Sequence, residues 1–71
     1  MVGGMPTDYR ITVGGRLSER LASAFDPFSL EHASGRTVLV GTVEDQAHLY
    51  GILDRIRDFG LELLRVEELD R

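Results

Sequence analysis

The chain is short, acidic and free of cysteine, and each of these properties narrows the classes of function open to it. It has 71 residues, a formal net charge of −4 and eight cationic side chains, all of them arginine. A chain of this length buries only about 60% of its unfolded surface, so association is a common source of added stability. The missing cysteines exclude disulfides, thiolate metal sites and cysteine nucleophiles. The negative charge disfavours nucleic-acid binding, because neutralising phosphates requires clustered cations.

Targeting and membrane signals are missing from the sequence. No apolar run reaches the roughly 18 residues that cross a bilayer. The first residues have neither the charged region nor the apolar region of a signal peptide. We therefore expect a cytoplasmic protein without membrane contact, with residues 1–7 as a flexible tail and residues 8–71 as one domain.

The first third of the chain predicts a strand followed by a short helix. Residues 9–13 alternate apolar and polar side chains, which is typical of a strand with one buried face. Gly14-Gly15 ends this strand, and Ser18 caps a short helix that stops near Asp26-Pro27. One side of this helix is apolar and is formed by Leu17, Leu21, Ala24, Phe25 and Phe28.

The middle of the chain predicts a β-hairpin with strands over residues 30–33 and 37–40. Its turn is Ser34-Gly35, in which glycine supplies a positive φ. A two-residue turn places Leu30 opposite Leu39, with both facing the helices. His32 lies on the same side as Leu30. The side chains that then face away from the helices are Ser29, Glu31, Val38 and Val40.

A long helix and a final strand are predicted near the C-terminus. Thr42 is the expected N-cap and Asp45 the third residue of a capping box. Gly60 falls where a left-handed residue ends a helix, which gives a length of roughly 17 residues. Leu64 and Val66 then alternate with polar residues, as in a strand. The helix carries an apolar stripe of Leu49, Ile52, Leu53, Ile56 and Phe59.

Six elements in the order β-α-β-β-α-β, joined by right-handed crossovers, predict an α+β ferredoxin-like sandwich. We expect a four-stranded antiparallel sheet in the order 4-1-3-2, with two helices on one face. The alternative arrangement is a swapped dimer in which the same elements are exchanged between chains.

The sheet face that the helices leave uncovered is the leading candidate for a functional surface. Strand alternation directs Leu64 and Val66 inward and leaves Leu63 outside. An apolar centre with a charged rim is typical of an interaction surface, although scattered exposed aliphatic residues without function are also common. We predict a homodimer or a complex with another protein. The expected contact residues are Arg10, Val38, Val40, Leu63 and Arg65.

The first strand–helix turn is a second, weaker candidate site. Glycine-rich turns of this kind can present backbone N–H groups to an anion. The candidate ligand-binding residues are Gly14, Gly15, Arg16 and Ser18. The turn lacks the GxGxxG and GxxxxGK[ST] patterns, so a purely structural turn is the alternative.

Catalytic and metal-binding signatures are missing from the sequence. His48 follows Glu44 by one helical turn, but no second histidine occurs at helical spacing, so a solvated helix residue is the simpler interpretation. No nucleophile–base pair has a sequence signature. We therefore expect a non-catalytic protein without a metal or cofactor. The enzymatic alternative, a cofactorless oxygenase or isomerase of the small ferredoxin-like type, would require an enclosed pocket between sheet and helices.

Two resemblances follow from these residues. The sequence resembles a group of short uncharacterised actinobacterial proteins over residues 9–69, which implies no activity. The residues that carry this likeness are Gly15-Arg16-Leu17-Ser18-Glu19-Arg20, Phe25-Asp26, the spaced run from Gly41 to Leu53, and Arg57-Asp58-x-Gly60-Leu61. Asp58-Phe59-Gly60 before an apolar strand also resembles ACT domains, which imply pairing side by side or face to face and amino-acid binding near the first turn. Gly14-Gly15-Arg16 replaces the Asp-x-Pro-Gly-type turn of those domains.

Overall fold

The computed structural model describes residues 6–15, 17–25 and 28–69. Residues 1–5 of the tail predicted over residues 1–7, Arg16 and the predicted helix stop at Asp26-Pro27 lie outside the described residues. Thr7, the last residue of that predicted tail, is the first residue of a strand. Within these ranges no helix has the length and apolar content needed to cross a membrane. The elements are β1 (Thr7–Gly14), α1 (Glu19–Ala22), the 3-10 turn η1 (Ser23–Phe25), β2 (Ser29–Ala33), β3 (Arg36–Val43), α2 (Gln46–Asp58) and β4 (Glu62–Leu69).

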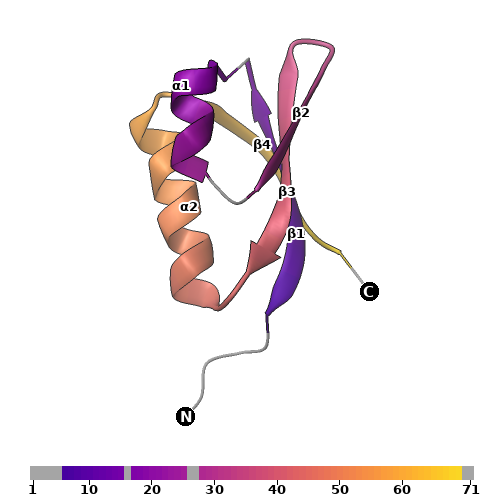
Figure 1. Ribbon diagram of the computed structural model, residues 1–71, viewed down its shortest axis with the longest axis vertical. Coiled ribbons are helices and arrows are strands. Elements are labelled where there is room, and N and C mark those ends of the chain that lie inside the picture. The colour runs from indigo at the N-terminus through magenta and orange to yellow at the C-terminus, as the bar shows by residue number, and fades with distance from the viewer. Residues whose placement is uncertain (1–5, 16, 26–27, 70–71) are drawn as a thin grey trace.

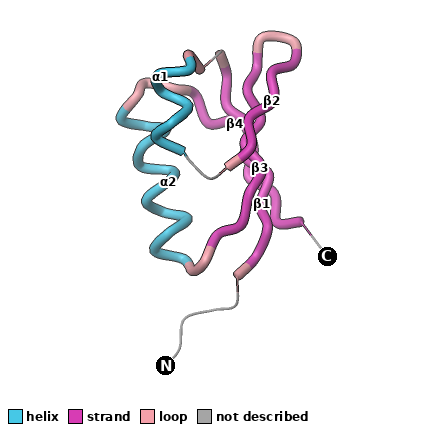
Figure 2. The backbone as a smooth tube through the Cα atoms, viewed as in Figure 1, coloured by secondary structure: helices cyan, strands magenta, loops and turns pink. Residues whose placement is uncertain are grey.

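The four strands form one antiparallel sheet, and both helices cover the same face of it (Figure 1). The strand order is β2-β3-β1-β4, which is the order 4-1-3-2 counted from the opposite edge. β1 and β3 are therefore central, and β2 and β4 are the edges. Figure 2 shows the resulting two layers, with the far side of the sheet uncovered by any described helix.

The β2–β3 hairpin has the predicted turn and register. Ser34 and Gly35 have φ values of 50° and 76°, as the two central residues of a type I′ turn require. Leu30 pairs with Leu39, and Glu31 pairs with Val38. Leu39 is consequently buried beneath the helices, whereas Val38 lies half-buried on the other face.

Helix α2 begins later than predicted, because β3 is longer than predicted. Val43 still pairs with Thr7 of β1, and the Thr42 hydroxyl donates a hydrogen bond of 2.7 Å to Asp8 across the same strand pair. The predicted N-cap role of Thr42 is therefore wrong. Asp45 caps the helix instead, since its carboxylate accepts from the backbone N–H of His48 at 2.8 Å. The helix has 13 residues.

The C-terminal end of α2 lies where the sequence placed it. Gly60 has a φ of 72°, in the left-handed region. Its N–H donates to the carbonyl of Arg57 at 2.9 Å, and the N–H of Leu61 donates to the carbonyl of Ile56 at 3.0 Å. These two bonds define a Schellman motif. Leu61 then packs against the core, and β4 begins at the next residue.

The hydrophobic core fills the space between the sheet and the helices. Its buried side chains are Ile11, Val13, Leu17, Phe25, Phe28, Leu39, Val43, Ile52 and Ile56. None of these belongs to β4, which is the edge strand beside β1. The apolar side chains of β4 therefore stay accessible, and this property defines the candidate site.

Candidate functional site

Strand β4 contains an irregularity that changes which way its residues face. Thr12 of β1 opposes Arg65, but Val13 opposes Leu63, so Leu64 has no partner in β1. One extra residue on one strand is a β-bulge. Directly opposed residues share a face of the sheet, so Leu63 lies on the helix-covered face with Val13. The prediction that Leu63 points to the uncovered face is therefore wrong.

Leu64 takes the position on the uncovered face that was expected for Leu63. Gly14 faces away from the helices because it alternates with buried Val13. A Cβ built on Gly14 would lie 3.8 Å from the Leu64 side chain and 3.4 Å from the Cβ of Glu62. Leu63 instead lines a pocket with Leu53, Ile56 and Leu61 beside α2. The bulge thus exchanges the predicted orientations of the two leucines.

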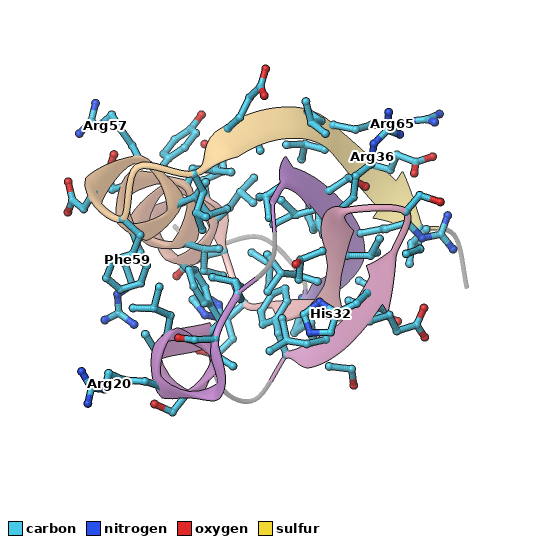
Figure 3. The ribbon with its side chains drawn as sticks, turned by 90° about the horizontal axis from the view of Figure 1, so that it is seen from above. Arg20, His32, Arg36, Arg57, Phe59 and Arg65 are labelled. Atoms are coloured by element: carbon cyan, nitrogen blue, oxygen red, sulfur yellow. The ribbon has the colours of Figure 1, made fainter. Side chains whose placement is uncertain are left out.

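The uncovered face carries the other residues predicted for it. Arg10 opposes Val40, and Thr12 opposes Val38. Figure 3 shows Arg65 on the side of the sheet away from the helices. Both valines are half-buried although no described helix covers them, so side chains of the sheet itself shelter them. This face is therefore less apolar at its surface than the sequence predicted.

A charge network lies across the β1–β4 boundary on this face. Glu67 is 3.5 Å from a guanidinium nitrogen of Arg10 and 3.2 Å from one of Arg65. Both arginine side chains are exposed, so each pair is worth about 0.2–1 kcal/mol. These ion pairs set the pattern of charge that a second strand would meet if it approached β4.

The most accessible large aliphatic side chains of the described residues lie on β4. Leu63, Leu64 and Val66 are 44%, 42% and 39% exposed. Among the described strands β4 pairs only with β1, so backbone N–H and C=O groups on its outer side point away from the sheet. Proteins usually block such an edge because it can pair with another strand. The accessible apolar part of the sheet is therefore its β4 edge.

The turn between β1 and α1 uses its backbone groups within the chain. The N–H of Gly15 donates to the carbonyl of Gly35 at 2.9 Å. The Thr37 hydroxyl accepts from the N–H of Leu17 at 3.3 Å and donates to the carbonyl of Gly15 at 3.0 Å. Ser18 accepts from the N–H of Leu21 as the cap of α1. The described groups thus have structural partners, and amino-acid binding of the ACT type stays a prediction.

The two histidines have separate structural contacts. His32 Nδ1 lies 3.2 Å from the Thr37 hydroxyl, and because that hydroxyl gives its one hydrogen to Gly15, the ring nitrogen must donate. His48 Nδ1 accepts from the backbone N–H of Glu44 at 3.0 Å, which leaves the ring hydrogen on Nε2. Among the described residues no three side chains are grouped to hold a metal ion.

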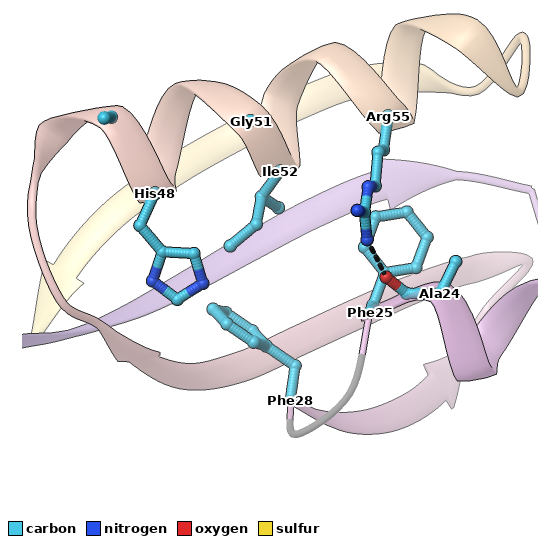
Figure 4. A pocket seen from close by; sticks show the side chains of 8 residues that line it. Ala24, Phe25, Phe28, His48, Gly51, Ile52 and Arg55 are labelled. Atoms are coloured by element: carbon cyan, nitrogen blue, oxygen red, sulfur yellow. Dashed lines mark hydrogen bonds between the residues drawn. The ribbon is translucent and has the colours of Figure 1, made fainter.

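A pocket of about 210 Å³ opens between α2 and the α1–η1 segment (Figure 4). Its polar ends are His48 and Arg55, and a guanidinium nitrogen of Arg55 donates to the carbonyl of Ala24 at 2.6 Å. The sequence pattern did not predict this pocket, although Gly51 in the middle of the helix was a signal for it. The lining residues are Ala24, Phe25, Phe28, Ala47, His48, Gly51, Ile52 and Arg55.

These features define a small α+β domain with one uncovered sheet face and an accessible edge strand. Residues 8–67 match the family described as a domain of unknown function (DUF8691), and the chain belongs to this family. No curated protein and no solved structure gives a significant match to the chain.

Proposed function

We propose that this chain is a non-catalytic interaction module of ferredoxin-like layout that binds a second copy of itself through its sheet. The supporting observation is the exposure of Leu63, Leu64 and Val66 on an edge strand with a single neighbour. Such an edge can add a strand from another chain. A domain of this size also gains stability by association. The half-buried valines of the uncovered face lie on β3, which β1 separates from this contact.

The charges on β4 favour one register for two antiparallel copies. Opposed residues must share a face, so Arg65 and Glu67, which oppose Thr12 and Arg10 on the uncovered face, are suitable partners. A two-fold axis through Val66 places Arg65 opposite Glu67 of the second copy on both sides of the axis. An axis through Arg65 or through Glu67 would oppose like charges at its centre, which is destabilising.

The same register suits the contacts already present within one chain. Arg65 lies 3.2 Å from its own Glu67, so two copies would form a ring of four charges with alternating sign. Val66 would meet its counterpart at the axis, on the helix-covered side of the extended sheet. Leu63 and Leu64 would lie further along the shared edge. The proposal therefore combines aliphatic burial with complementary charge.

Replacing Val66 with lysine should convert the assembly to monomer. The change removes the aliphatic contact at the axis and opposes two ammonium groups, so we expect the association constant to fall at least about tenfold, or about 1.4 kcal/mol. Sedimentation equilibrium over about 10–500 μM, a range suited to weak association, measures this change. Ala33→Lys on β2, the other edge, is the matched control and should leave the mass unchanged.

A second variant separates edge pairing from stacking of the uncovered faces. Val38→Asp combined with Val40→Asp alters β3, which is separated from β4 by β1. Edge pairing should survive this change, whereas stacking of the faces should not. The proposal that β4 forms the contact would be refuted if the natural sequence were monomeric at the highest concentration. It would also be refuted if Val66→Lys still dimerised. Far-ultraviolet circular dichroism confirms folding of each variant.

A further inference from the structure

Gly51 lies in the middle of α2, where glycine weakens a helix relative to alanine. A Cβ added there would meet no atom within 4 Å. Gly41 is different, because a Cβ on that residue would lie 2.8 Å from the ring of Phe28. Neighbouring groups therefore require glycine at position 41 but not at position 51. Gly51 lines the pocket, and a Cβ there would enter open space.

The walls of the pocket suit a flat apolar group. Phe25, Phe28 and Ile52 are buried core residues that line it. Figure 4 shows the ring of Phe28 facing α2 across the pocket, with Gly51 and Ile52 on the opposite side. Aromatic and aliphatic walls with a few polar groups are typical of small-ligand sites. The volume of about 210 Å³ limits the occupant to about one ring with small substituents.

Arg55 supplies a positive charge at one end of the pocket, and no acidic side chain of the described residues pairs with it. One of its five N–H donors is used by the carbonyl of Ala24. The ion pairs of the described residues involve Arg10, Arg57 and Arg65, and none involves Arg55. A planar guanidinium with free donors binds a carboxylate well, because two parallel hydrogen bonds can form.

His48 supplies a hydrogen-bond donor at the other end. Its Nδ1 accepts from the backbone of Glu44, so the hydrogen is on Nε2. In Figure 4 the ring of His48 extends toward the space between Phe28 and Ile52. His48 and Arg55 are seven residues apart on α2, or about 10 Å along the helix axis. This spacing suits a ligand with a carboxylate at one end and an acceptor at the other.

We infer that the pocket binds a small aromatic carboxylate, independently of the self-association proposed above. The ring lies between Phe28 and the backbone of Gly51, the carboxylate binds Arg55, and a substituent para to it accepts from His48. The charge on Arg55 selects the acid over a neutral analogue. The missing Cβ of Gly51 admits the ring.

Titration of the whole chain with 4-hydroxybenzoate, followed by amide NMR, tests the inference. We expect saturable shifts confined to residues 47–55 and to Ala24, Phe25 and Phe28, with a dissociation constant on the order of a millimolar for so small a ligand. The neutral analogue 4-hydroxybenzamide should bind at least about tenfold more weakly, because it lacks the charge-assisted contact. Arg55→Gln should reduce the affinity for the acid to that for the amide.

Gly51→Ala is the decisive variant, because it adds a methyl group to the lining of the pocket while improving the helix. It should unfold at a higher temperature than the natural sequence and yet bind 4-hydroxybenzoate at least about tenfold more weakly. Tyr50→Ala, on an exposed residue of the same helix outside the pocket, should bind normally. Val66→Lys should also bind normally, which separates this site from the self-association.

Three results would overturn the inference. They are equal affinity for the acid and the amide, full affinity in Gly51→Ala, and no saturable shift with 4-hydroxybenzoate at about 10 mM, a concentration well above the expected dissociation constant.

Discussion

Replacing Gly41 with alanine should destabilise the protein by about 2 kcal/mol, as expected for overpacking of a core. The new Cβ would lie 2.8, 2.9 and 3.0 Å from three ring atoms of Phe28. The ring has little freedom to withdraw, because Phe28 is buried in the core and Gly41 belongs to central strand β3. Thermal unfolding monitored by circular dichroism should show a Tm lowered by roughly 8–16 °C.

Two controls identify the cause of this loss. Phe28→Leu should relieve the clash, so the double variant with Gly41→Ala should cost at least about 0.5 kcal/mol less than the two single changes added together. Gly51→Ala should shift the Tm in the opposite direction, by about 1 kcal/mol of added stability. A Gly41→Ala protein that unfolds at the natural temperature, or strictly additive costs, would mean that the ring does not rest on this glycine.

Replacing Thr37 with valine should cost about 2–4 kcal/mol. Thr37 is the buried polar residue at the inner face of β3, and its hydroxyl contacts Leu17, Gly15 and His32. Valine has nearly the same shape but leaves the N–H of Leu17 and the carbonyl of Gly15 without that partner. A buried polar group left unpaired costs about 1–3 kcal/mol, and because Leu17 is buried whereas Gly15 is exposed, the two groups together give about 2–4 kcal/mol. Urea denaturation should show a lower midpoint with an unchanged slope.

Thr12→Val is the matched control for that experiment. Thr12 lies on the uncovered face of the neighbouring strand, opposite Val38, and is half-buried. Its change to valine should stay within about 0.5 kcal/mol. If Thr37→Val were as mild as Thr12→Val, the hydroxyl would not be the group that joins the first turn to the hairpin.

The sequence alone was sufficient to predict the structure at positions where a residue type has one strong structural preference. Gly35 and Gly60 have the positive φ values expected of them. The turn fixed the hairpin register, and the pairing of Leu30 with Leu39 followed from it. These features depend on contacts between residues close in the chain, so a single sequence contains the information needed.

The incorrect predictions concern residues whose positions depend on partners distant in sequence. Thr42 has good N-cap chemistry, but its place opposite Asp8 keeps it in β3. Leu63 and Leu64 were assigned from simple alternation, which a bulge opposite Thr12 and Val13 interrupts. A bulge has no signature in the residues of β4 alone. The candidate contact surface moved toward the edge of the sheet for this reason.

The pocket could have been suspected but not located from sequence. Gly51 breaks the helix pattern without being near either end, which marks a position that needs explanation. The opposite wall comes from Phe25 and Phe28, more than twenty residues earlier. Their meeting with His48 and Arg55 depends on how α1 and α2 pack against one sheet face (Figure 1).

The most direct test of the central claim is sedimentation equilibrium of Arg65→Glu, alone and together with Glu67→Arg. In the register centred on Val66, the single change opposes like charges on both sides of the axis and should lower the association constant at least about tenfold. The double exchange restores opposite charges across the axis but removes the Arg10–Glu67 pair within each chain, so it should raise the association constant at least about threefold above that of the single variant. A single variant that associates as tightly as the natural sequence, or a double variant that remains monomeric, would contradict β4 edge pairing in this register.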